Sequence, residues 1–399
     1  MLLVNDFTFY IEINEFDYIF YIGENDEEKN FKILYEYKVP LNGIQNSRIS
    51  DANIVLNTIK KNIYFIEHKL NYTFKEVVII LDNFNPTFIN LTGFKRLNGS
   101  QVLKENITYI LNTLKSSIDQ IEIKKIVLHI FNSRFFLDKK EMINLPIGLF
   151  GDFYTHELSF TLMCKNNYKS LKGIFDRCNL KIRKIFIKSF VLGVNISDRH
   201  KNNTTFFHIK INENSSKIFY FENNSLKYEQ NFEFGTNIII KDMSKIISLN
   251  TEVIKNILDK IELSSNFAED DFIEEKFFNK KVYRKIKKKL IYEIALARIN
   301  EISDIMLFKN INLRYFDKLP KTIFFDIEDK TYFKCFEKIY KKTFSMNGSN
   351  VINFINSVSS ADMLSSANKL VNFGWKKEAI PFFKSKKSLI AKLFETIFG

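Results

Sequence analysis

The sequence predicts an α/β protein built from two lobes. Stretches with the period of helices alternate with short β-branched and aromatic runs that are typical of strands, and this alternation continues through two similar halves of the chain. The chain has 399 residues, which are too many for one compact core, so two or more domains are expected. The hydrophobic content of 45% and the charged content of 26% are ordinary for a globular protein.

The first half is expected to open with two strands and then to alternate helices with strands. The first helix is recognised from isoleucines at helical spacing, and the strand after it from a run of valine and isoleucine. The expected order is a strand pair (7–21 and 31–39), a helix (53–70), a strand (76–81), a long helix (98–119), two strands (124–131 and 156–164), a helix (168–178), a strand (180–187) and a short helix (189–196).

The second half is expected to open with a hairpin and to contain more helix. Asparagine and serine residues between the two strands of this hairpin are typical of a turn. The expected order is the hairpin (206–211 and 217–222), two helices (241–247 and 252–261), an acidic patch (268–275), a basic run (280–289), a long helix (282–307), a strand (321–326) and two helices (332–340 and 360–371).

Charge and cysteine content restrict the class of partner and the compartment. A net charge of +13 favours anionic partners, but no Arg-rich run, RNA-binding signature or helix-turn-helix pattern is present, so no nucleic-acid partner is expected. Cys164, Cys178 and Cys335 are odd in number and widely spaced, which is typical of reduced, buried thiols in a cytosolic protein. No signal peptide is visible, and no apolar stretch approaches the ~20 residues that span a bilayer.

The last stretch, residues 384–399, has the pattern of a short basic amphipathic helix. Its large apolar residues recur as adjacent pairs one turn apart, with lysines on the flanks. The apolar residues are Leu389, Ile390, Leu393, Phe394, Ile397 and Phe398, and the flanking lysines are Lys386, Lys387 and Lys392. Such a helix suits the plane of an anionic membrane surface, where binding would be peripheral and reversible. The alternative is a final helix packed on the body of the protein.

Four stretches carry short motifs in a defined order. The first is Leu-Pro-Ile-Gly-Leu-Phe-Gly at 145–151, followed by the segments 158–163 and 171–187. The others are Gly-Thr-Asn-Ile-Ile-Ile-Lys-Asp-Met at 235–243, Ile-Ala-Leu-Ala-Arg-Ile-Asn-Glu-Ile at 294–302 and Leu-Ser-Ser-Ala-Asn-Lys-Leu-Val-Asn-Phe-Gly at 364–374. Together with the tail, they resemble the bacterial cell-division family FtsA, an actin-like membrane tether, in order and spacing over nearly the whole chain.

The resemblance implies an actin-like (ribonuclease H-like) two-lobed fold with an inserted subdomain of the FtsA type and a C-terminal amphipathic helix. By this resemblance, residues 1–81 and 347–374 form the lower-lobe core, and residues 82–163 form the inserted subdomain. Residues 164–234 and 291–346 form the second core domain, with the upper subdomain at 235–290. A linker at 375–383 leads to the amphipathic helix at 384–399.

The nucleotide-binding turns of the family are altered in this sequence. The family holds phosphates in glycine-rich hairpins, because glycine lets backbone N–H groups approach the anion closely. The aligned positions carry Glu12 and Asn14 in the first hairpin, Ser215 in the second, and Glu328 and Asp329 in the third. Carboxylates at these positions repel phosphate. A degenerate site without ATP, magnesium or enzymatic activity is therefore expected, and a rewired ATPase whose acids bind a metal is the alternative.

Two lysines strengthen this expectation. Lys210 and Lys217 occupy the positions of two family aspartates, so magnesium loses its expected ligands. We expect these lysines to pair with Glu12, Glu15 or Glu213. The five histidines show no zinc-ligand spacing with the cysteines, so no metal site is expected.

A basic run is expected to mark the start of the long helix. Its members are Arg284, Lys285, Lys288 and Lys289. A run of like charges on a helix is most often a solvated face. In the family, however, this part of the upper subdomain receives the C-terminal tail of the tubulin-like division protein FtsZ, so the resemblance implies a peptide site here.

The function implied by the resemblance is that of a divisome scaffold. Such a protein tethers FtsZ filaments to the cytoplasmic face of the inner membrane at the division site and associates with itself. Its expected partners are the FtsZ C-terminal tail, an anionic membrane surface and further divisome proteins. The alternatives are an active actin-like ATPase of cell division or pilus assembly, and a basic protein that binds nucleic acid.

Overall fold

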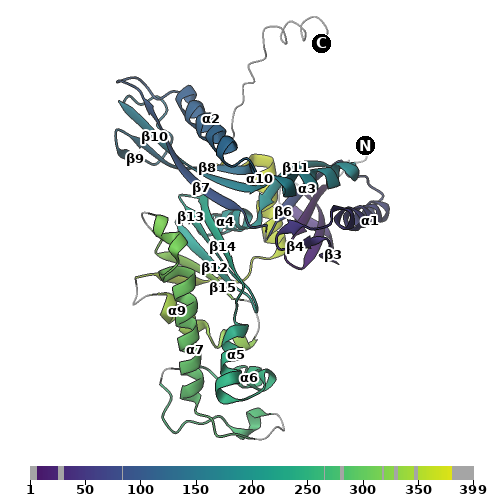
Figure 1. Ribbon diagram of the computed structural model, residues 1–399, viewed down its shortest axis with the longest axis vertical. Coiled ribbons are helices and arrows are strands. Elements are labelled where there is room, and N and C mark those ends of the chain that lie inside the picture. The colour runs from purple at the N-terminus through teal and green to yellow at the C-terminus, as the bar shows by residue number, and fades with distance from the viewer. Residues whose placement is uncertain are drawn as a thin grey trace, which may run out of the picture. The chain divides into compact units, whose positions relative to one another are not determined.

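The computed structural model describes residues 7–25, 31–82, 84–264, 266–278, 283–316, 319–327, 331–345 and 349–379. The chain divides into two compact units. The first unit comprises Met1–Gly23, Leu34–Phe186 and Lys369–Gly399, and the second comprises Glu24–Ile33 and Ile187–Asn368. Both units combine helices with a sheet (Figure 1), which confirms the predicted α/β class.

The first unit contains a five-stranded sheet with the order β11-β6-β1-β2-β3. Its strands are β1 (Thr8–Ile13), β2 (Asp17–Asn25), β3 (Phe31–Pro40), β6 (Glu76–Leu81) and β11 (Lys181–Ile187). The central strand β1 runs antiparallel to β2 and parallel to β6. A small hairpin, β4 (Ile44–Gln45) and β5 (Arg48–Ile49), lies between β3 and the first helix.

Helix α1 (Ala52–Leu70) forms because its apolar residues repeat at helical spacing and a carboxylate caps its start. The Asp51 carboxylate accepts hydrogen bonds from the backbone N–H groups of Asn53 (2.8 Å) and Ile54 (3.0 Å). Asn71, in the left-handed conformation, ends the helix. Helix α1 contacts α3 (Lys165–Arg177), which precedes the edge strand β11.

A second sheet of the first unit is formed by residues 87–164. Its order is β7-β10-β8-β9, and its strands are β7 (Thr87–Arg96), β8 (Lys125–Leu137), β9 (Lys140–Met142) and β10 (Phe153–Cys164). The paired strands are antiparallel. Helix α2 (Lys104–Ile121) lies along this sheet in Figure 1 and packs Ile110, Leu111 and Ile118 into its core. This sheet occupies the stretch expected to form the inserted subdomain.

The second unit contains another five-stranded sheet, with the order β14-β13-β12-β15-β16. Its strands are β12 (Phe206–Ile211), β13 (Ser216–Glu222), β14 (Ser225–Phe232), β15 (Thr322–Ile327) and β16 (Val351–Phe354). The helices that accompany it are α4 (Lys188–Arg199), α5 (Asn237–Ile247), α6 (Thr251–Leu258), α7 (Lys288–Ser303), α8 (Thr331–Lys334), α9 (Glu337–Phe344) and α10 (Ser360–Phe373), the last of which runs on into the first unit.

The two five-stranded sheets share one topology. In the first, β1 pairs antiparallel with β2 and parallel with β6, and β11 lies at the edge beyond β6. In the second, β12 pairs antiparallel with β13 and parallel with β15, and β16 lies at the edge beyond β15. The prediction of two similar halves is therefore confirmed at the level of strand order.

Several predicted elements differ from the observed ones. The strand predicted at 7–21 is a hairpin of β1 and β2, because Asn14 forms a tight turn between them. The helix predicted at 98–119 begins only at Lys104, and the helix predicted at 332–340 is divided into α8 and α9. Strands β7, β14 and β16 were not predicted, since β7 and β14 contain many polar residues and β16 has only four residues.

The long helix predicted at 282–307 is shorter at both ends. It begins at Lys288 because the residues before it pair with an extended segment: the N–H of Ile273 donates to the Ile286 carbonyl (2.8 Å), and the N–H of Lys288 donates to the Asp271 carbonyl (2.9 Å). At its other end, α7 passes into a π-helical turn, Asp304–Phe308. The short 3₁₀ segments Glu275–Phe278 and Ile311–Tyr315 lie outside it.

The sheets also place two segments differently from the predicted domain boundaries. Strand β11 lies in the first sheet, although residues from 164 onward were assigned to the second core domain. Strand β16 lies in the second sheet, although residues 347–374 were assigned to the lower-lobe core. Both are edge strands reached through a helix, so sequence order does not reveal which sheet they join.

Candidate functional site

The first hairpin, between β1 and β2, forms hydrogen bonds within its own turn. The side-chain oxygen of Asn14 accepts from the backbone N–H groups of Phe16 (2.8 Å) and Asp17 (2.7 Å), and the N–H of Asn14 donates to the Asp17 carbonyl (3.1 Å). Glu12 is buried, and its carboxylate accepts a hydrogen bond from the Tyr21 hydroxyl (3.1 Å). Backbone N–H groups that could face an anion at this tip are therefore engaged by the Asn14 side chain.

The second hairpin, between β12 and β13, also has hydrogen bonds between residues of its own turn. The N–H of Asn212 donates to the Ser215 carbonyl (2.9 Å), and the Asn212 side-chain amide donates to the Ser215 hydroxyl (3.2 Å). The Lys255 ammonium lies 3.2 Å from a Glu213 carboxylate oxygen. The tip is thus held by side-chain contacts of Asn212, Ser215 and Glu213.

The start of helix α5 packs directly on this second hairpin. The N–H groups of Thr236 and Asn237 donate to the carbonyls of Asn212 (3.0 Å) and Glu213 (2.9 Å). A side chain at Gly235 would overlap the Asn212 carbonyl oxygen and lie 2.7 Å from the Glu213 carbonyl oxygen. This close approach gives a physical reason for the glycine of the Gly-x-Asn motif at 235–237.

Lys210 and Lys217 contact acids on neighbouring strands, and the pairing of Lys217 with Glu12, Glu15 or Glu213 stays a prediction. Lys210 Nζ lies 3.8 Å from Asp326 Oδ2, and Lys217 Nζ lies 3.2 Å from Glu229 Oε1. Glu229 also accepts a hydrogen bond from the buried Ser189 hydroxyl. Asp326 and Glu229 come from strands β15 and β14, and nothing in the local sequence of the hairpin indicates either contact.

The remaining part of the predicted nucleotide site is only partly described. Strand β15 ends at Ile327, and Glu328 and Asp329 lie outside the described residues. In the part of the chain that the structure describes, no group of three or more His, Cys, Asp or Glu side chains could hold a metal ion. The three cysteines form no disulfide and are partly buried.

The predicted peptide site is an ion-paired ribbon. Residues 269–274 and 284–289 run side by side, with Phe272 bridged to Lys287. Lys288 lies 2.8 Å from Asp271, and Lys287 and Lys289 both contact Glu269. The hydrogen bond from Lys289 lowers the pKa of the exposed Glu269 carboxyl. The acidic patch predicted at 268–275 therefore neutralises part of the basic run.

Two further members of the basic run also have intramolecular contacts. The Arg284 guanidinium donates to the Ser248 carbonyl (3.1 Å), and Lys285 Nζ lies 4.3 Å from the centre of the Phe272 ring. Arg284 and Lys285 precede helix α7, although the predicted helix at 282–307 included them. The structure thus brings Arg284, Lys285, Lys288 and Lys289 onto one ribbon, each with a contact inside the chain.

Within the predicted linker at 375–383, residues 375–379 are described, and residues 377–379 pair with strand β8. The N–H of Asn132 donates to the Lys377 carbonyl, and the N–H of Ala379 donates to the Ile130 carbonyl, both at 2.7 Å. Residues 377–379 therefore lie antiparallel beside strand β8. His129 Nδ1 lies 2.9 Å from Glu378 Oε1, and Lys184 Nζ lies 3.4 Å from Glu378 Oε2. We call these contacts the tail clamp. The local sequence carries no strand pattern that could have revealed it.

The predicted membrane-binding residues, from Lys386 to Phe398, lie outside the described residues. Among the helices that are described, none combines the length and apolar character needed to cross a bilayer.

Comparisons with known proteins relate the chain to actin-like proteins of cell division. No protein-family model matches. The chain is 21% identical over 296 residues to the cell division protein FtsA of Buchnera aphidicola subsp. Schizaphis graminum, covering 73% of this chain and 70% of that protein. It is 18% identical over 289 residues to FtsA of Escherichia coli K12, covering 71% and 68%.

A solved structure supports the fold. The PilM–PilN type IV pilus biogenesis complex superposes with a TM-score of 0.50 at 9% identity, covering 91% of this chain and 95% of the matched chain. This likeness shows an actin-like fold. The distant sequence matches add that the relatives with this pattern are FtsA proteins.

Proposed function

We propose that this protein is a cell-division scaffold that tethers FtsZ filaments to the inner face of the cytoplasmic membrane through binding, without ATP hydrolysis. The observation that carries the proposal is the match to FtsA over 73% of the chain, in a protein whose fold is actin-like. The basic amphipathic pattern at 384–399 supplies a membrane anchor of the reversible kind. Self-association or a shared filament would multiply the weak attachment of each tail.

The two hairpins support a role without nucleotide. In the first, Asn14 occupies backbone N–H groups that a phosphate would need. In the second, Asn212 is bonded to Ser215 across the tip, and the carbonyls of Asn212 and Glu213 are bonded to the start of α5. Without ATP at this site, magnesium has no phosphate to bridge. Isothermal titration with Mg-ATP tests this part, and a micromolar dissociation constant would restore the ATPase alternative.

The alternative is an active actin-like ATPase of cell division or pilus assembly. The PilM–PilN match is compatible with a pilus role, since PilM has the same fold. At 9% identity that match concerns the fold alone, whereas the sequence matches are to FtsA. We therefore favour cell division.

The membrane anchor is tested by sedimentation with anionic liposomes. Changing Phe394 and Ile397 together to glutamate should abolish sedimentation, because each large side chain contributes at most about 1.5–3 kcal/mol of burial and two would be replaced by charges. The control is Ser388→Glu, which adds a charge opposite the apolar stripe of the same predicted helix and should retain most binding. Unchanged sedimentation of the double variant would return the tail to the packed-helix alternative.

The FtsZ site is tested with a labelled peptide of the FtsZ C-terminal tail. Reversing Arg284 and Lys288 to glutamate should weaken binding, and added salt should do the same. Glu269→Gln supplies the opposite test: it releases Lys287 and Lys289 from their acidic partner and should strengthen binding of an acidic tail. Equal affinity for the wild type, the Arg284 and Lys288 reversal and Glu269→Gln would move the peptide site elsewhere.

A further inference from the structure

Strand β16 lies at the end of the second unit's sheet and pairs with β15 in parallel. The N–H of Val351 donates to the Lys321 carbonyl (2.7 Å), and the N–H of Ile355 donates to the Phe325 carbonyl (2.9 Å). Because main-chain groups alternate between the two sides of a strand, the N–H and carbonyl groups of Ile352 and Phe354 point away from β15. Among the described strands, none follows β16 on that side.

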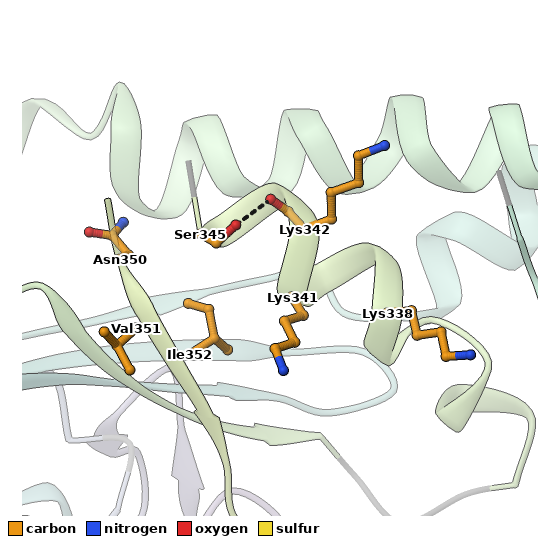
Figure 2. Close-up of a pocket in the computed structure, with 7 residues that line it drawn as sticks. All are labelled: Lys338, Lys341, Lys342, Ser345, Asn350, Val351 and Ile352. Carbon is orange, nitrogen blue, oxygen red and sulfur yellow. Dashed lines mark hydrogen bonds between the residues drawn. The ribbon is translucent and has the colours of Figure 1, made fainter. Parts of the chain in front are cut away.

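A basic cavity of about 490 Å³ adjoins this strand (Figure 2). Its lining residues come from helix α9, the turn after it and the start of β16, namely Lys338, Lys341, Lys342, Ser345, Asn350, Val351 and Ile352. Three of them are lysines, and none of these described lining residues is acidic. Figure 2 shows Lys338 and Lys341 extending from one side of α9 and Lys342 from the other. All three lysines are exposed, and Lys338 also contacts Glu262.

We propose that the β16 edge, together with this cavity, binds an extended acidic segment of a partner protein as an added strand. Main-chain hydrogen bonds to Ile352 and Phe354 would supply affinity for an extended backbone, in the manner of β-strand addition. The lysines of α9 would select acidic side chains. Val351 is 56% exposed and offers an apolar contact to the segment.

This site is separate from the ribbon that carries Arg284 and Lys288. It lies on α9 and β16, and it requires only the fold of the second unit, with no FtsZ, membrane or nucleotide. A competing explanation is that the lysines only protect the open edge from aggregation, which is a common use of lysine at sheet edges. The two explanations differ in whether an acidic extended peptide binds.

The test uses the full chain and a fluorescein-labelled octapeptide of alternating glutamate and valine, followed by fluorescence anisotropy. The acidic peptide should bind, and the matching lysine–valine peptide should not. Two N-methylated forms of the acidic peptide identify the mode of binding, because methylation on alternate residues blocks the N–H groups of one edge only. One form should lose binding and the other should retain it.

Variants of the protein locate the site. Changing Lys341 and Lys342 together to glutamate should weaken binding of the acidic peptide at least tenfold. The matched control reverses Lys241 and Lys245, which lie exposed on helix α5 and change the net charge equally. Amide hydrogen exchange of Ile352 and Phe354 should slow in the complex.

Three results would each overturn the proposal. The first is no binding of the acidic peptide at millimolar concentration, as the edge-protection explanation requires. The second is equal binding of the lysine–valine peptide or of both N-methylated forms. The third is an equal effect of the α9 and α5 charge reversals.

Discussion

His208 is a buried histidine in the central strand β12, with its ring centre 4.6 Å from that of Phe219. Burial, together with the charges of Lys210 and Lys217, lowers the pKa of His208 to about 3 from its ordinary value of 6.5. The unfolded chain therefore binds more protons than the folded chain between these two values. Stability should fall as pH drops through this window, by up to ~1.4 kcal/mol per pH unit.

Replacing this histidine should remove its share of the acid sensitivity. His208→Phe keeps an aromatic side chain in the core, and the free energy of unfolding should depend less steeply on pH between 6.5 and 3. The measurement is urea unfolding at a series of pH values. Ile209→Val in the same strand is the control, because it should cost about 0.5–1.5 kcal/mol equally at every pH. An unchanged slope in His208→Phe would contradict the assignment.

Gly235 is needed because the backbone of Asn212 approaches its Cα closely. A Cβ atom there would overlap the backbone of Asn212, so Gly235→Ala should destabilise the chain by about 1–3 kcal/mol. Gly173, in the middle of α3, has nothing within 4 Å of an added Cβ, and Gly173→Ala should stabilise by about 0.5–1 kcal/mol. Thermal unfolding of the two variants should shift the midpoint in opposite directions, and a shift of the same sign would refute this reasoning.

At the scale of elements, the tail clamp on strand β8 depends on the ionised Glu378 carboxylate. Burial opposes ionisation, but the hydrogen bond and charge of His129 and the charge of Lys184 outweigh it and lower the pKa of Glu378. A carboxyl whose folded pKa is lowered stabilises the fold above its unfolded pKa of about 4.5, and this contribution is lost as pH falls through the folded value.

Removing the charge of Glu378 should loosen the segment 377–379. Glu378→Gln leaves His129 and Lys184 without their anion, and breaking a buried pair in this way typically costs about 3–5 kcal/mol. The amides of Asn132 and Ala379 should then exchange faster at neutral pH, and the wild type should approach the variant in acid. Lys376→Gln, at a neighbouring position, is the control and should leave both amides protected. Equal protection in Glu378→Gln would show that the backbone bonds alone hold the tail.

The elements that the sequence predicted well are those with local signals. Helix α1 has an apolar stripe and an Asp51 cap, and strand β6 is a continuous apolar run, so both were located almost to the residue. The start of α7 and the clamp at 377–379 were missed because they depend on pairing with distant segments. Such pairing leaves no periodic pattern in the sequence, and propensity alone cannot reveal it.

For the molecule as a whole, the two similar halves were predictable, but their sheet membership was not. The same strand order appears in both five-stranded sheets, although β11 and β16 were assigned to the wrong halves by sequence order. At the candidate site, the polar residues of the two hairpin turns were visible in the sequence. The compensating contacts of Asn14, Lys210 and Lys217 required the structure, because their partners come from backbone groups and from other strands.

The central claim is that this actin-like chain recruits FtsZ to a membrane by binding and without ATP. The most direct measurement is the fluorescence of labelled FtsZ from the same cell, with GTP, on a supported bilayer containing anionic lipid, before and after addition of the chain. We expect FtsZ to accumulate on the bilayer equally with and without Mg-ATP, and not with the Phe394→Glu, Ile397→Glu double variant. No accumulation above the bare bilayer, or accumulation only with Mg-ATP, would contradict the claim.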